Sequence, residues 1–181
     1  NWGKNYTYKD SEGLVDKLLS YEGIDIVMTR NEKGQIVIKS KRGTALLEDK
    51  ETGVMYTPLL NDPFGYNGIK DYLTYDEVLD LTFDTLYPDS LTQIVQIFKS
   101  ARCGDIVISA ETGYDLRRDF ELPEHKSSHG SLKSDHMHVP LIMNKKVPIS
   151  RIRTVDLFPT ILDFLSLPCS TKIDGKKLDI Y

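Results

Sequence analysis

The sequence predicts an α/β fold, because segments typical of antiparallel strands occupy its first half and helix–strand units its second. The strand-like segments are short and β-branched or apolar, and Gly, Asn or Lys turns separate them. In the second half an amphipathic helix leads into a fully apolar run of strand length, which is typical of a parallel sheet. We therefore expect a mostly parallel sheet flanked by helices, with a smaller antiparallel β element in the first half.

Residues 11–23 (SEGLVDKLLSYEG) are predicted to form the leading helix of the first half. Ser11 is a candidate N-cap, and Gly23 is a candidate for the residue that ends the helix. The apolar face at helical spacing consists of Leu14, Val15, Leu18 and Leu19. This helix is expected to precede a β-rich region in the chain.

The β-rich region contains three consecutive strand candidates, 23–30 (GIDIVMTR), 34–40 (GQIVIKS) and 43–49 (GTALLED). Their turns and β-branched composition predict an antiparallel meander. Residues 54–59 (VMYTPL) are a candidate for one more strand. The stretch 59–77 is rich in Gly, Asp, Asn and aromatic residues, which predicts a long surface loop of the kind that is often functional or mobile.

The second half starts with a predicted helix over residues 88–100 (PDSLTQIVQIFKS), with Pro88 in its first turn. Its buried face would consist of Leu91, Ile94, Val95 and Phe98. The apolar run 104–111 (GDIVISAE) is expected to be a central parallel strand. Residues 139–145 (VPLIMNK) are a further strand candidate.

The last predicted helix lies within residues 154–168 (TVDLFPTILDFLSLP). Asp156 can cap this helix, and Pro159 would stand in its first turn. The expected buried face consists of Leu157, Ile161, Leu162 and Leu165. Capping accounts for Asp156 without a catalytic role.

Composition excludes few classes of function. The formal net charge of −4 gives no electrostatic reason to expect nucleic acid or an anionic membrane surface as a partner. No apolar run approaches the roughly 18 residues that a membrane span requires, and the first residues show no signal-peptide pattern. Cys103 and Cys169 are expected to be unpaired thiols, which favours a cytoplasmic location.

All four histidines lie close together, at His125, His129, His136 and His138. Imidazole is a common ligand of zinc and related ions. His136 and His138 would face the same side of a strand, but each of these two, like His125, is more often a surface or hydrogen-bonded side chain. His129 is the best ligand candidate, because small neighbours and Gly130 allow the backbone to approach a ligand closely.

The run 128–168 (SHGSLKSDHMHVPLIMNKKVPISRIRTVDLFPTILDFLSLP) resembles the closing segment of the type I phosphodiesterase/nucleotide pyrophosphatase family, within the alkaline phosphatase superfamily. The likeness rests on His-Gly, the VPL strand, and TVD followed by PTIL. The upstream run 87–117 (YPDSLTQIVQIFKSARCGDIVISAETGYDLR) is similar to the family's approach to that histidine. The resemblance covers roughly residues 85–168 well and the first 80 residues loosely.

The resemblance implies a hydrolase of phosphate esters with two divalent metal ions, zinc by expectation, and an alkaline-phosphatase-like mostly parallel sheet. His129 matches the last metal ligand of the family. The family's earlier Asp-His-Gly pair and its Thr or Ser nucleophile have no counterpart in this sequence. The chain is therefore expected to be the C-terminal portion of a larger enzyme, with 1–84 as an inserted, lid-like β-rich subdomain and 85–181 as part of the metallohydrolase core.

Such a portion would supply one metal ligand and part of the core sheet, with little or no activity alone. The alternative is a non-catalytic binding or structural domain that keeps the closing topology of the superfamily. Expected partners are a phosphate-ester or nucleotide-type substrate, and a second copy of the chain through an exposed sheet edge. Nucleic acid and membranes are not expected as partners.

Four other side chains are candidate substrate contacts. Arg117 and Arg118 could contact a phosphate oxygen, although such a pair is more often a solvated charge cluster. Asp62 and Tyr66 could line a substrate entrance in the stretch 59–77, where turn formation also explains the Asp, Pro and Gly residues. The sequence leaves the identity of the substrate open.

Overall fold

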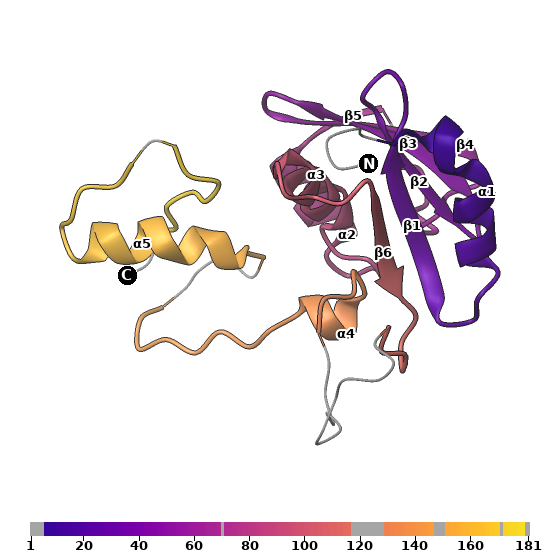
Figure 1. Cartoon of the computed structure of the whole chain (residues 1–181). Coiled ribbons are helices and arrows are strands. Elements are labelled where there is room, and N and C mark those ends of the chain that lie inside the picture. Colours follow the sequence, from indigo (N-terminus) through magenta and orange to yellow (C-terminus); the bar gives the residue numbers. More distant parts are fainter. Residues whose placement is uncertain (1–5, 70, 117–128, 147–150, 171, 180–181) are drawn as a thin grey trace. The chain divides into compact units, whose positions relative to one another are not determined.

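The computed structural model describes residues 6–69, 71–116, 129–146, 151–170 and 172–179 (Figure 1). The chain divides into two compact units, Asn1–His138 and Val139–Tyr181. The first unit contains a six-stranded sheet with helices on both faces, and the second contains a short helix and extended segments. The fold is α/β, as predicted.

The sheet has the strand order β5-β4-β3-β2-β1-β6. The strands are β1 (Ile24–Arg30), β2 (Ile36–Ser40), β3 (Thr44–Lys50), β4 (Gly53–Leu60), β5 (Asp71–Thr74) and β6 (Ile106–Ala110). Every neighbouring pair is antiparallel. The predicted meander of the first three strands is therefore confirmed, and β4 extends it.

The predicted mostly parallel, alkaline-phosphatase-like sheet is wrong. Strand β6 is an edge strand that pairs antiparallel with β1, with Val27 opposite Ile108 and Met28 opposite Val107. Its apolar residues are partly covered on both faces, because Ile106 contacts the smaller core cluster and Val107 the larger one, while Ile108 is exposed. An apolar run shows that both faces are covered, and it does not fix the direction of the neighbouring strand.

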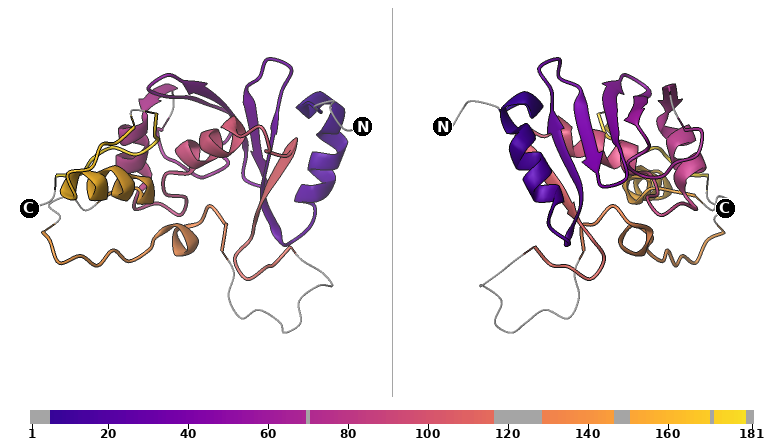
Figure 2. Two further views of the ribbon diagram at one scale, coloured as in Figure 1. Left: turned by 60° about the vertical axis from the view of Figure 1, so that its left-hand side comes forward. Right: turned by 90° about the vertical axis from the view of Figure 1, so that its right-hand side faces the viewer.

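Helices cover both faces of the sheet (Figure 2). Helix α1 (Tyr8–Leu19) packs on β1 and β2 through a small cluster that includes Val15, Leu19 and Val27. Helices α2 (Tyr75–Thr82) and α3 (Ser90–Lys99) lie on the opposite face with the larger core. Strand β1 is consequently buried on both sides along most of its length.

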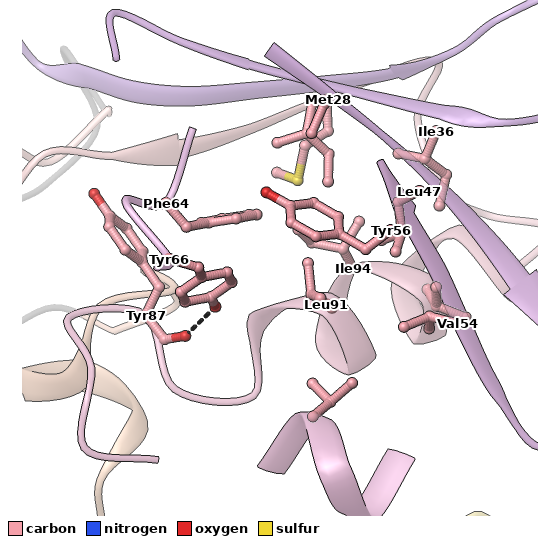
Figure 3. Packing of buried hydrophobic residues seen from close by; sticks show 14 of the residues in the cluster. Met28, Ile36, Leu47, Val54, Tyr56, Phe64, Tyr66, Tyr87, Leu91 and Ile94 are labelled. Atoms are coloured by element: carbon pink, nitrogen blue, oxygen red, sulfur yellow. Dashed lines mark hydrogen bonds between the residues drawn. The ribbon is translucent and has the colours of Figure 1, made fainter. Parts of the chain in front are cut away.

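The larger core combines aliphatic residues of the sheet with a group of aromatic rings (Figure 3). Leu91 and Ile94 of α3 face Leu47 and Tyr56 of the sheet, as expected from the predicted helical face. The ring of Phe64 lies 5.1 Å from Tyr66 and 5.3 Å from Tyr87, measured between centroids. The hydroxyl group of Tyr66 donates to the carbonyl oxygen of Tyr87, which links residues 61–69 to the segment before α3.

Three local predictions for the first unit are wrong. Helix α1 starts after Thr7, whose backbone N–H donates to Asp10, while Ser11 lies inside the helix and donates to the carbonyl of Thr7. The helix ends at Leu19, before Gly23. The stretch 59–77 is no surface loop, because Phe64 and Tyr66 enter the core and because it contains β5 and the start of α2.

In the second unit, α5 (Leu157–Phe164) follows a single turn of 3₁₀-helix, Thr154–Asp156, and confirms the predicted last helix. Its predicted buried face is wrong, because Ile161 and Leu165 are exposed while Pro159 and Thr160 are buried. The carboxylate of Asp156 accepts from the backbone N–H groups of Arg153, at 3.0 Å, and Lys176, at 2.9 Å. The predicted capping of α5 by this side chain is therefore wrong, since its carboxylate makes no cap hydrogen bond to α5 and binds the backbone before and after the helix instead. Residues 139–146 form no strand, so the predicted VPLI strand is wrong for this described segment.

Candidate functional site

The candidate site centres on residues 129–134, here called the His129 loop, which contains the predicted metal ligand. His129 and Gly130 are exposed, and Gly130 has a φ of +98°, in the region that favours glycine. Beyond Gly130 the chain turns inward, since Ser131 and Lys133 are buried and Leu132 packs against the larger core. The loop therefore presents His129 at the surface from an anchored base.

Backbone hydrogen bonds hold this base on two sides. The N–H of Leu132 donates to the Oγ of Ser109 in β6 at 3.3 Å, and the N–H of Ser134 donates to the carbonyl of Leu86 at 2.9 Å. The hydroxyl of Ser90, at the start of α3, donates to the carbonyl of Leu132 at 3.4 Å. The sheet and the N-terminal end of α3 thus position the loop together.

The two histidines that follow the loop have structural contacts. They lie in and just after α4 (Ser134–Met137), so the predicted strand-like arrangement of His136 and His138 is wrong. The Nδ1 of His136 accepts from the N–H of Ser131 at 3.3 Å. The ring of His138 stacks on Phe83, with centroids 4.7 Å apart. These contacts agree with the interpretation that both are bystanders.

Beneath the loop lies a group of charged and polar side chains that we call the Asp25 cluster: Asp25, Arg42, Tyr87, Glu111 and Lys133. The carboxylate of Asp25 accepts from Nη2 of Arg42 at 2.8 Å and from the hydroxyl of Tyr87 at 2.7 Å. The ammonium group of Lys133 lies 4.0 Å from Asp25 and forms an ion pair with Glu111. The cluster joins β1, the β2–β3 turn, the segment before α3, and the His129 loop.

Charges in this cluster balance, with two carboxylates facing one guanidinium and one ammonium group. Isolated charges are costly to bury, so such pairing is what allows Asp25 and Lys133 to lie in the interior. Burial raises the pKa of the Tyr87 hydroxyl, and its hydrogen bond to the Asp25 carboxylate raises that pKa further. Tyr87 therefore remains a neutral hydrogen-bond donor at neutral pH.

The other predicted site residues are not brought to His129 by the described structure. His125, Arg117 and Arg118 lie outside the described residues. Tyr66 is buried in the aromatic core, and Asp62 accepts from the N–H of Phe64 at 2.8 Å, as in a turn. Tyr66 therefore serves in core packing and Asp62 in turn formation, and neither is seen to line a substrate entrance.

Metal coordination by His129 stays a prediction. Within the described ranges, no three His, Cys, Asp or Glu side chains gather in a way that could hold a metal ion.

Cys103 and Cys169 are both free thiols. None of the helices in the described part of the chain is long and apolar enough to cross a bilayer.

Comparisons with protein-family models, with curated proteins and with solved structures found no match to this chain.

Sequence reasoning missed the Asp25 cluster, although one signal for it was present. Asp25 interrupts an otherwise apolar strand sequence, IDIVM, and a charged residue buried on a central strand requires a partner. The partners could not be identified in advance, because Arg42, Tyr87 and Lys133 come from distant segments that meet only in the folded chain.

Proposed function

We propose that this chain contributes His129 as one metal ligand to a metal-dependent phosphodiesterase or nucleotide pyrophosphatase whose remaining ligands lie outside the chain. The proposed complete site holds two divalent ions, with zinc as the first candidate, and takes a phosphate-ester or nucleotide-type substrate. In this proposal residues 1–84 act as a lid-like subdomain, the chain alone has little activity, and the protein is cytoplasmic.

The observation that carries the proposal is the contrast between His129 and the other described histidines. His129 is exposed on a loop with an anchored base, whereas His136 accepts a hydrogen bond from Ser131, and His138, which is also exposed, stacks on Phe83. A histidine that projects from an anchored loop base needs less ordering to meet a ligand than one on a free segment, and preorganisation limits the entropic cost of binding. The sequence resemblance of residues 128–168 supplies the reaction class.

A second candidate is a non-catalytic binding or structural domain. The observation that favours it is the all-antiparallel sheet, which differs from the parallel sheet that the resemblance implied. In that case His129 would be an ordinary surface histidine, and its removal would leave metal binding unchanged.

Zinc calorimetry and hydrolysis of a chromogenic phosphodiester, on the longest natural protein that contains this chain, separate the two candidates. We expect His129→Ala to lower the zinc stoichiometry or to weaken zinc binding at least about tenfold, with a matching loss of kcat. The matched control is His138→Phe, which removes an imidazole but keeps a ring against Phe83. Equal zinc binding in the wild type and both variants would contradict the enzyme proposal and support the second candidate.

A further inference from the structure

Lys133, four residues after the proposed ligand His129, has a buried ammonium group. The side chain of Lys133 is 7% exposed, a rare degree of burial for lysine. It forms its ion pair with Glu111, which follows β6, and it faces Asp25 of β1. Ion pairs thus connect the loop to β1 and to the residue that follows β6, the two strands that pair at this edge of the sheet.

The ion pair of Lys133 favours an ordered loop. Gly130 provides conformational freedom next to His129, and the chain from Ser131 onward is fixed by hydrogen bonds. Within residues 129–134, Lys133 carries the formal charge, so its ion pair is the contact with the highest penalty for being broken. Pulling the loop away from the sheet would leave Asp25 and Glu111 facing an empty position.

Asp25 is itself held rigidly. Its carboxylate is 1% exposed and receives hydrogen bonds from Arg42 and Tyr87. Arg42 is fixed in turn, because its Nε donates to the carbonyl of Pro63 at 2.8 Å. The anchor of Lys133 therefore belongs to the core of the first unit.

We propose that Lys133 is a positioning residue for His129: its buried ammonium group, held by Glu111 and Asp25, fixes residues 131–134, the base from which His129 projects. This inference rests on the proposed function for its catalytic consequence, and on the described contacts for its structural part. Residues that hydrogen-bond to a metal ligand commonly change metal affinity or activity by about 10–100-fold, and the lower end of this range is expected for a residue that acts through the loop backbone.

The first experiment measures amide hydrogen exchange of this chain for wild type, Lys133→Met and Lys133→Arg. We expect Lys133→Met to speed exchange at residues 131–134 at least about tenfold while the β2–β3 amides keep their protection. Lys133→Arg, which retains a cation, should restore part of the protection. The matched control is Lys39→Met, which removes a partly buried lysine paired with Asp16. Unchanged exchange at 131–134 in Lys133→Met would overturn the inference.

The milder variant Glu111→Gln keeps the experiment decisive if Lys133→Met does not fold. Glu111 is partly exposed, and its replacement retains the contact of Lys133 with Asp25. We expect faster exchange at the same amides by a smaller factor. Unchanged exchange in this variant would equally overturn the inference.

The second experiment measures zinc affinity and the kinetics of phosphodiester hydrolysis in the longest natural protein that contains this chain. We expect Lys133→Met to weaken zinc binding about tenfold and to lower kcat more than it changes KM, with partial rescue by Lys133→Arg. If His129→Ala weakens zinc binding but Lys133→Met does not, Lys133 does not position the ligand. If His129→Ala has no effect, the proposed function fails, and the exchange experiment alone decides whether Lys133 orders the loop.

Discussion

Arg42 and Asp25 form a salt bridge of unequal burial: the side chain of Asp25 is 1% exposed and that of Arg42 is 38% exposed, with Nη2 2.8 Å from Oδ1. Water can therefore reach the guanidinium group but not the carboxylate. The carboxylate depends on its protein partners, which include the hydroxyl of Tyr87 at 2.7 Å. Asp25 is accordingly the member of the cluster whose loss should disturb the most contacts.

Replacing Asp25 by alanine is expected to lower the free energy of unfolding by about 2–3 kcal/mol, because it removes the buried acceptor of Arg42 and Tyr87 and leaves Lys133 with Glu111 as its ion-pair partner. Urea denaturation of the 181-residue chain measures this change. The control is Asp16→Ala, which removes an exposed partner of Lys39 and should cost about 1 kcal/mol or less. Equal losses in the two variants would contradict the role assigned to Asp25.

Gly53 and Gly13 are expected to respond in opposite directions to alanine. A Cβ atom at Gly53 would meet the carbonyl oxygen of Leu73 and lie 2.8 Å from the Cα of Thr74, both of them backbone atoms. Gly53→Ala should therefore push β5 from β4 and cost about 1–3 kcal/mol.

Gly13 lies in α1 with open space around it, so Gly13→Ala should stabilise the chain by about 1 kcal/mol through helix propensity. Thermal denaturation of both variants checks the pair of signs. A Gly53→Ala variant as stable as wild type would show that the β4–β5 contact is looser than described.

Burial raises the pKa of Tyr56, Tyr66 and Tyr87 above the ordinary value of 10.0. Below that pH the hydroxyls are neutral in both states, so stability is unaffected. As the pH rises above about 10, the unfolded chain loses these protons while the folded chain retains them, and the free energy of unfolding falls. Urea midpoints measured from about pH 9 to about pH 11 should show this decline.

Tyr56→Phe provides the specific test of that pH dependence, since it removes one of the three buried hydroxyls. We expect a shallower decline above about pH 10 than in the wild type. Tyr21→Phe is the control, because Tyr21 is 54% exposed, and the decline should keep its slope. Identical slopes in all three proteins would refute the assignment of the decline to buried tyrosines.

The antiparallel meander was predictable because its signals are local. Each of the segments 23–30, 34–40 and 43–49 carries its own strand composition, and short turns between them require neighbouring strands. The helix at 88–100 was predictable for the same reason, although the predicted place of Pro88 in its first turn is wrong, because Pro88 precedes the N-cap residue Asp89. Local sequence describes such elements well, since their partners are adjacent in the chain.

The errors come from contacts between distant segments. The direction of β6 depends on pairing with β1, and the burial of Tyr66 depends on Tyr87 and Phe64. Loop-like composition in residues 59–77 concealed the aromatic residues that fill the core. At the candidate site, His129 could be singled out by its neighbours, but its anchor Lys133 required knowledge of where Asp25 lies.

Among the strands of the described residues, only the β1–β6 pair joins strands that are not consecutive in sequence, with Ile26 opposite Ser109. Closing a long chain segment costs more entropy than forming a hairpin, and contacts between distant segments therefore form more slowly. We therefore expect β1 to β5 to assemble first and β6 to join late. During synthesis, the edge of β1 would stay open until residues 106–110 have left the ribosome, and an open edge can pair with other chains. Aggregation of nascent protein should thus depend most on how soon β6 becomes available.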